Sequence, residues 1–163
     1  MPQNPRLRPV AESRVQMTEI VLPEDTNPGG TIFGGRVLAL VDKCAAVAAM
    51  RHARSEVLTV SVDSVEFKSP VRVGDILLLD GWLNAAFRSS MEVEVQVRAE
   101  EPTTGRCSLT TRAFVTMVAV GADGRATAVP ALEIRGEEEH RRAQEAADRR
   151  RARLERRGSG HAP

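Results

Sequence analysis

The residues best suited to chemistry in this chain lie in a glycine-rich stretch and in the helix that we expect to follow it. The stretch Asn27–Gly35 contains four glycines, namely Gly29, Gly30, Gly34 and Gly35. Glycine lets the backbone approach a ligand closely, and the first N–H groups of a helix have no intrahelical acceptor. Such donors can polarise a carbonyl group and stabilise a developing oxyanion. The alternative interpretation is that this stretch is a flexible connection with glycine caps before the helix and has no chemical role.

Asp42 is the second candidate. It follows about two turns into a helical pattern that is otherwise apolar and rich in alanine. A partly buried carboxylate at this point could act as a general base or as a nucleophile, because its surroundings tune its pKa. A solvated aspartate paired with a neighbouring side chain is the alternative.

The third candidate is the turn Arg88-Ser89-Ser90, which precedes a strongly alternating segment. Two hydroxyl groups, exposed backbone N–H groups and a guanidinium together could hold a phosphate or an amide. An ordinary polar turn between two strands would have the same composition.

Composition and charge narrow the function classes. The formal net charge is +1, from 23 Lys and Arg against 22 Asp and Glu, which argues against a protein held on nucleic acid or membrane by bulk charge. Aromatic residues make up only 3%, so a base-stacking platform is not expected. Two cysteines and three scattered histidines favour neither a disulfide framework nor a metal site. Without an apolar run of signal-peptide or membrane-span type, we expect a cytoplasmic protein.

Hydrophobic periodicity predicts the elements that position the candidates. Apolar residues recur at three- and four-residue spacing from about Gly34 to Arg54, which predicts one long helix. Alternating or β-branched patterns predict five strands, and short turns between consecutive strands favour antiparallel pairing. These strands span Arg14–Leu22, Val57–Phe67, Ile76–Phe87, Ser90–Ala99 and Ser108–Val120.

This element order predicts an α+β fold in which one helix packs on one antiparallel sheet. Ser90–Ala99 alternates most regularly, so we expect its apolar face in the core and its polar face in water. A single copy would leave a strand edge exposed. We expect Val57–Phe67 to be that edge and to pair with a second copy of the chain.

A length of 163 residues is typical of one domain, flanked here by two segments of different composition. We expect a flexible arm over 1–13, the folded domain over 14–132, a charged helix over 133–157 and a disordered tail over 158–163. Residues 141–157 contain eight arginines against three acidic residues. Interleaved Glu145, Asp148 and Glu155 argue against a nucleic-acid-binding arm.

Five motifs follow one another along the chain. They are Pro23-x-Asp25-x-Asn27-x2-Gly30-x2-Phe33-Gly34-Gly35-x6-Asp42, Arg51-His52, Thr59-Val60-Ser61-Val62-Asp63, Phe67-x2-Pro70-Val71-x2-Gly74-Asp75 and Ser89-Ser90-Met91-Glu92-Val93. Taken together, they resemble the motifs of the hotdog-fold acyl-CoA thioesterases. The likeness is to the acyl-CoA hydrolase branch, which includes the brain-type and cytosolic hydrolases and small bacterial single-domain relatives, and it covers roughly 15–132. Many members have His where Phe33 stands.

The resemblance implies a hotdog fold, in which a five- or six-stranded antiparallel sheet wraps around a long central helix, here with an additional charged C-terminal helix. It also implies a homodimer with two sites at the subunit interface, assembled further into a hexamer. Asp42 and Asn27 match the catalytic pair, which comes from opposite subunits in the family. The N–H groups of Gly34 and Gly35 would polarise the thioester carbonyl.

The resemblance further implies contacts to the coenzyme A part of the substrate, with no separate cofactor or metal. The arginine-rich stretch then becomes a candidate clamp for the phosphates of coenzyme A. The expected contacts are Val60, Ser61, Val62, Ser89, Ser90 and Met91 for the pantetheine amides, and Arg88 and Arg151 for the phosphates.

Two alternatives stay open at this stage. One is an acyl-CoA-binding regulatory module without catalysis, because a fold alone does not fix function. The other is a hydratase on the same fold, which would favour a histidine in the site. Phe33 removes the nearest such histidine. Neither the length of the acyl chain nor the role of Asp42 as base or nucleophile follows from the residues.

Overall fold

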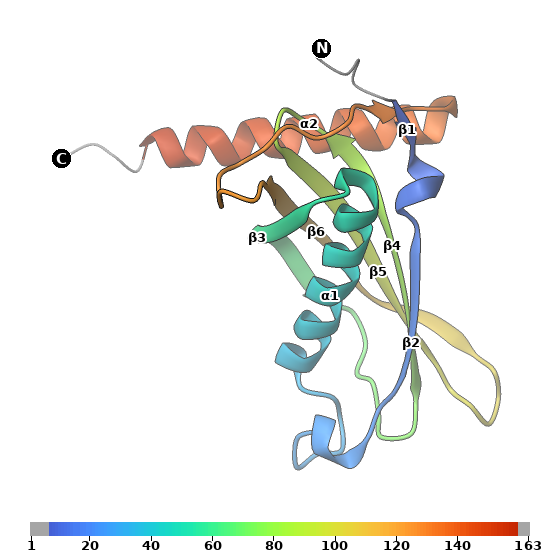
Figure 1. Cartoon of the computed structure of the whole chain (residues 1–163). Coiled ribbons are helices and arrows are strands. Elements are labelled where there is room, and N and C mark those ends of the chain that lie inside the picture. The colour runs from blue at the N-terminus through green and yellow to red at the C-terminus, as the bar shows by residue number, and fades with distance from the viewer. Residues whose placement is uncertain (1–6, 160–163) are drawn as a thin grey trace.

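The computed structural model of the chain describes residues 7–159, without the side chain of Ser64, and confirms the predicted α+β architecture. A long helix, α1, packs against a curved antiparallel sheet, and a second long helix, α2, crosses the strands near one end of that sheet (Figure 1). The main elements are β2 (Val15–Ile20), α1 (Gly34–Ala53), β3 (Glu56–Phe67), β4 (Ile76–Ala86), β5 (Ser90–Glu100), β6 (Cys107–Val120) and α2 (Gly136–Ser159).

The sheet has five strands in the order β2-β4-β5-β6-β3, and every pairing is antiparallel. Strand β3 lies at one edge, as predicted, and pairs only with β6 among the described strands. A separate pair of very short strands, β1 (Arg8–Pro9) and β7 (Leu132–Glu133), is parallel. In residues 7–159, neither helix has the length and apolar character of a membrane-spanning segment.

Small side chains bring α1 close to the sheet. Cys44, Ala45, Ala48 and Ala49 are fully buried in the main core. Opposite them, Gly81 in β4 lies so near that an added Cβ would be 2.7 Å from Cys44 Sγ. Burial raises the pKa of the Cys44 thiol to about 12, so this sulfur is a packing group rather than a nucleophile.

Replacing Gly81 by alanine is expected to lower the free energy of unfolding by about 1–3 kcal/mol, because the new methyl group overpacks the contact with Cys44. Urea titration followed by circular dichroism measures this change. The double variant Gly81→Ala with Cys44→Ala is expected to recover part of the loss, because it removes the sulfur atom. An equal loss in the single and double variants would show that the contact is not the cause.

The termini differ from the expected arm and tail. Instead of an irregular arm over 1–13, the described part, from residue 7, contains β1 and a 3-10 turn (Val10–Ser13). Val10 and Ser13 are buried, and Ser13 Oγ accepts a hydrogen bond from the Leu83 N–H at 3.0 Å. These contacts are made by single residues and not by a repeating pattern of apolar residues. No regular structure was therefore predicted for this segment. Residues 1–6 of the expected arm lie outside the described residues.

At the other end, residues 132–133 form β7 rather than the start of the expected helix. Helix α2 begins at Gly136 instead of residue 133 and extends to Ser159, so the first part of the expected tail is helical. Gly136 has a φ of 73°, a left-handed conformation that glycine adopts readily at such a boundary. Residues 160–163 lie outside the described residues.

The polar face of β5 is buried at Glu92 and Glu94, which corrects the prediction that this face lies in water. Glu92 and Glu94 are 1% and 0% exposed because α2 and its arginines cover this side of the sheet. Arg149 in α2 donates hydrogen bonds of 2.6 and 3.1 Å to the two oxygens of Glu92. Asn84 donates to both carboxylates, at 3.2 Å to Glu92 and 3.0 Å to Glu94. Alternation identifies a polar face but not what covers it.

Glu94 is held by a second arginine, Arg112, at 2.8 Å. Burial alone would raise the pKa of the Glu94 carboxyl, but hydrogen bonds from Arg112, Gln96 and Asn84 outweigh burial and leave this pKa below its usual range. Glu94 is therefore ionised at neutral pH. The layer between α2 and the sheet is thus a network of charged and amide groups.

Candidate active site

The start of α1 is fixed by the loop that precedes it. Phe33 N–H donates to the Asp25 carbonyl at 2.9 Å, and Arg36 pairs with the Asp25 carboxylate at 2.8 Å. Because the helix begins at Gly34, the N–H groups of Gly34 and Gly35 have no acceptor within it. These donors lie at the positive end of the helix dipole, as an oxyanion-binding site requires.

Asn27 shapes this loop with its side chain. Its carbonyl oxygen accepts hydrogen bonds from the N–H groups of Gly29, at 2.9 Å, and Thr31, at 3.3 Å. Its amide nitrogen donates to Thr31 Oγ1 at 2.8 Å. An amide nitrogen carries two hydrogens, so a second one is left for a water molecule or a carbonyl group. Within one chain, Asn27 therefore acts on its own loop, and no contact joins it to Asp42.

Asp42 lies about 12 Å along the helix axis from Gly34, at ~1.5 Å per residue. Its side chain is half-buried, and one carboxylate oxygen accepts a hydrogen bond from Thr59 Oγ1 at 2.5 Å. Thr59 comes from β3, so a strand and a helix meet at this carboxylate. The bond fixes one oxygen of Asp42 and leaves the other to act on a substrate.

Thr59 is the site residue that the sequence analysis missed. It stands in the quoted motif Thr59–Asp63, but only the residues after it were expected to bind substrate. A hydroxyl in a strand pattern gives no sign of its partner 17 residues earlier in the chain. Thr59 and Asp42 meet because β3 packs against α1 in the folded chain, so their hydrogen bond is a tertiary contact.

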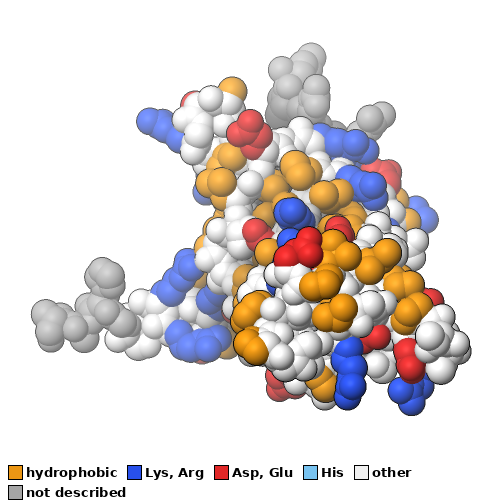
Figure 2. Space-filling view, turned by 90° about the horizontal axis from the view of Figure 1, so that it is seen from below, with side chains coloured by type: hydrophobic (Ala, Val, Ile, Leu, Met, Phe, Trp, Pro, Cys, Tyr) orange, Lys and Arg blue, Asp and Glu red, His pale blue; other side chains and the backbone are white. Residues whose placement is uncertain are grey.

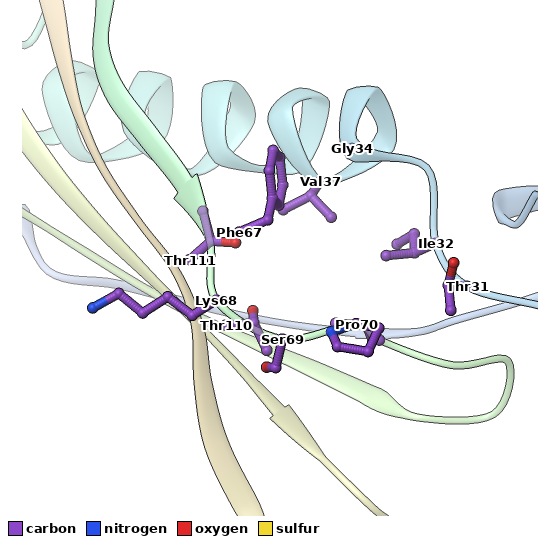
Figure 3. Close-up of a pocket in the computed structure, with 11 residues that line it drawn as sticks. Thr31, Ile32, Gly34, Val37, Phe67, Lys68, Ser69, Pro70, Thr110 and Thr111 are labelled. Atoms are coloured by element: carbon purple, nitrogen blue, oxygen red, sulfur yellow. The ribbon is translucent and has the colours of Figure 1, made fainter.

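A cavity of about 270 Å³ opens beside the first turn of α1 (Figure 3). The ring of Phe67 lies over Gly34, where an added Cβ would be 3.2 Å from it. Phe67 and Val37 lie beside the helix (Figure 3), so the wall nearest the helix is apolar, and Lys68 points away from the other lining side chains. The lining residues are Thr31, Ile32, Gly34, Val37, Phe67, Lys68, Ser69, Pro70, Val71, Thr110 and Thr111.

Apolar side chains continue around this end of the molecule. Phe33 and Phe67 are 52% and 51% exposed. Figure 2 views the molecule from below, the end at which α1 begins, and shows apolar side chains gathered between scattered charges. An apolar surface beside helix N–H donors suits a thioester, whose carbonyl oxygen is polar and whose acyl chain is not.

The expected contacts Val60, Ser61 and Val62 lie on the outer strand of the sheet. Val60 and Val62 are 43% and 42% exposed, whereas Ser61 Oγ is buried and has no hydrogen-bond partner. No described strand pairs with the outer edge of β3. Backbone groups on that edge are open to an extended ligand or to a strand of a second copy.

The turn Arg88–Met91 is only partly available for binding. The carbonyl oxygens of Arg88, Ser89 and Ser90 already accept hydrogen bonds from the N–H groups of other residues. Met91 is 0% exposed and pairs with strands on both sides, which removes it from the candidate pantetheine contacts. The pattern placed Met91 beside the serines without revealing that β5 is an inner strand. The exposed side chain of Arg88 remains available.

The arginine-rich stretch, the predicted phosphate clamp, binds in part the protein's own carboxylates. Arg149 and Arg153 pair with Glu92 and Asp63 of the sheet. Arg151, the predicted phosphate contact, is 68% exposed in its side chain but donates to Asp148 at 2.5 Å. Buried carboxylates need compensating cations, so much of the local positive charge is neutralised within the chain.

The chain is similar to several known proteins. A model of the thioesterase superfamily matches residues 29–106. An uncharacterized acyl-CoA thioester hydrolase of Bacillus subtilis is 38% identical over 137 residues, which are 84% of this chain and 80% of that protein. A crystal structure of an apo-hexameric acyl-CoA thioesterase superposes with a TM-score of 0.88 at 48% identity, covering 93% of this chain and 97% of the other.

An acyl-CoA hydrolase of Staphylococcus aureus has been solved in complex with butyryl coenzyme A, coenzyme A and coenzyme A disulfide. It has a TM-score of 0.88 and 34% identity, and the match covers 95% of this chain and 94% of that one. Variants of the same hydrolase with an aspartate, a threonine or an asparagine replaced by alanine are also solved. The site described above contains the same three residue types.

Proposed function

The chain belongs to the thioesterase superfamily, and from this premise we propose that it hydrolyses an acyl-CoA thioester to a carboxylic acid and free coenzyme A. One observation carries the proposal. Asp42, oriented by the Thr59 hydroxyl at 2.5 Å, follows two turns after helix N–H groups that border a cavity with an apolar wall. A base or nucleophile, oxyanion donors and room for an acyl chain are the parts that thioester hydrolysis needs.

In the proposed reaction, the thioester carbonyl oxygen accepts hydrogen bonds from the N–H groups of Gly34 and Gly35 of a second copy of the chain, because within one copy these groups lie ~12 Å along the helix from Asp42. Asp42 takes a proton from a water molecule, whose oxygen attacks the carbonyl carbon. The carbon–sulfur bond then breaks, and coenzyme A leaves as a thiolate that takes up a proton. Attack by Asp42 itself, through an anhydride that water later hydrolyses, gives the same products. A thiolate leaves readily, so the proposed reaction requires neither a metal nor a strong general acid.

The proposed enzyme is a dimer in which Asn27 of a second copy orients the water or the carbonyl group. Two features support this arrangement: Asn27 contacts only its own loop within one chain, and the outer edge of β3 is open. Further assembly into a hexamer is proposed by analogy with the hexameric thioesterase structures. Val60, Ser61, Val62, Arg88, Ser89 and Ser90 remain the proposed contacts to coenzyme A, with Arg151 as a further phosphate contact.

The geometry argues against a hydratase. His52 is the histidine on α1, but it lies about 27 Å along the helix from Gly34, at ~1.5 Å per residue. It is fully buried, and its Nε2 lies 2.8 Å from the Pro130 carbonyl oxygen. No hydratase base is therefore found on this helix near the proposed carbonyl position.

Release of free thiol from acyl-CoA, followed with a thiol-reactive dye, tests the proposal. We expect turnover that is proportional to enzyme concentration with at least one of acetyl-, butyryl-, octanoyl- and palmitoyl-CoA. The same panel measures the preferred chain length. Calorimetry with each acyl-CoA provides the second measurement, because binding without thiol release would replace the proposal by a non-catalytic acyl-CoA-binding module.

A further inference from the structure

Helix α2 is attached to the sheet mainly through arginines. Ala146 of this helix is buried, and several of its guanidinium groups lie on carboxylates of the sheet or over aromatic rings. Arg142 lies 4.8 Å from the Trp82 ring, Arg149 3.7 Å from the Phe114 ring and Arg150 4.6 Å from the Phe87 ring. These rings are three of the chain's five aromatic residues.

The arginine farthest along α2 that contacts the sheet reaches the strand of the proposed active site. Arg153 Nη1 donates to Asp63 Oδ2 at 2.8 Å, and the two side chains are only 12% and 20% exposed. Asp63 lies on β3, four residues after Thr59. Partial burial reduces the solvent screening of this pair compared with the exposed pairs elsewhere on α2.

Strand β3 is irregular at this point. It is an edge strand, and its register with β6 shifts twice, between Thr59 and Ser61 and between Asp63 and Glu66. The three residues between these shifts stay in register with β6, and Asp63 lies opposite Phe114. Since Arg149 stacks on Phe114, α2 contacts both strands at the same cross-strand pair.

We propose that Arg153 and Asp63 are positioning residues, through which α2 fixes the part of β3 that presents Thr59 to Asp42. The inference rests on the proposed function. Asp42 and Thr59 belong to different elements, so their 2.5 Å hydrogen bond requires β3 to keep its place against α1. Neither Arg153 nor Asp63 touches the reacting atoms. Their contribution is to keep the strand from shifting at its irregular segment.

The test uses three variants and one matched control. Arg153→Met and Asp63→Asn each remove one charge while keeping similar size, and Arg153→Asp with Asp63→Arg exchanges the charges. The control is Arg141→Met, which removes an arginine of the same helix that pairs only with Glu138 and Glu145 on its exposed face. For each variant, kcat, KM, the coenzyme A dissociation constant and Tm are measured on the full chain.

We expect each single variant to lower kcat about tenfold with a smaller change in KM, because small displacements of catalytic groups cost up to ~100-fold. The charge exchange should recover most of the lost kcat, and Arg141→Met should retain the wild-type value. A lowered Tm with unchanged kcat, or no recovery in the exchanged pair, would overturn the inference and leave the pair a purely structural contact.

The measurements distinguish an error in the proposed function from an error in this inference. If the wild-type protein releases no thiol, the proposed hydrolysis is wrong. The position of β3 is then measured by coenzyme A affinity, since Val60, Ser61 and Val62 on the same strand are proposed contacts. A weaker affinity in both single variants, restored by the exchange, supports the positioning role, and an unchanged affinity rejects it.

Discussion

Replacing Asp42 by asparagine is expected to lower kcat/KM for acyl-CoA by about 10²–10⁴-fold, the range typical of a lost general base. Asparagine keeps the size of the side chain and an oxygen that can accept the hydrogen bond from Thr59 Oγ1. It cannot take a proton from water, and it is a poor nucleophile. Thiol release from the best acyl-CoA of the panel measures the effect, and an unchanged Tm and coenzyme A affinity show that the site is intact.

The matched control is Asp123→Asn, which changes a carboxylate in the turn after β6. Its contact is the N–H of Arg125 at 3.0 Å, and we expect wild-type turnover. A single turnover in ¹⁸O-labelled water then separates the two roles of Asp42. A general base puts labelled oxygen into the acid at once, whereas a nucleophile transfers its own unlabelled oxygen first. Wild-type kcat/KM in Asp42→Asn would remove Asp42 from the reaction.

The parts of the site that depend on local sequence could be predicted. Gly34 at a helix start and Asp42 two turns later follow from spacing and periodicity, because both lie on one element. These features depend on neighbours in the chain, which the sequence displays directly.

The parts that depend on contacts between distant segments could not be predicted. Thr59 looked like any hydroxyl in a strand, because its partner Asp42 lies on another element. Met91 looked accessible, because the pattern does not reveal that β5 is an inner strand. Glu92 and Glu94 looked solvated for the same reason: the segment that covers them, α2, begins more than 40 residues later.

The buried carboxylates carry the second large prediction. Replacing Arg149 by methionine is expected to lower the free energy of unfolding by about 3–5 kcal/mol, because it leaves the Glu92 carboxylate buried without its cation. Glu92 is 1% exposed, and its remaining partner, Asn84, is neutral and shared with Glu94. The loss of the guanidinium stacked 3.7 Å from the Phe114 ring adds to the effect. Urea unfolding of the variant and the wild type measures the difference.

Removing both charges separates two effects on the free energy of unfolding, namely the cost of one unpaired buried charge and the contribution of the intact ion pair. The double variant Arg149→Met with Glu92→Gln is expected to recover much of the stability, because no ionised group is then buried without a partner. Arg141→Met, which breaks exposed pairs on the same helix, should change stability by at most about 1 kcal/mol. If Arg149→Met costs no more than Arg141→Met, the Glu92 carboxylate does not depend on Arg149 as its counterion. The arginines of α2 would then be surface charges rather than the counterions of a buried layer.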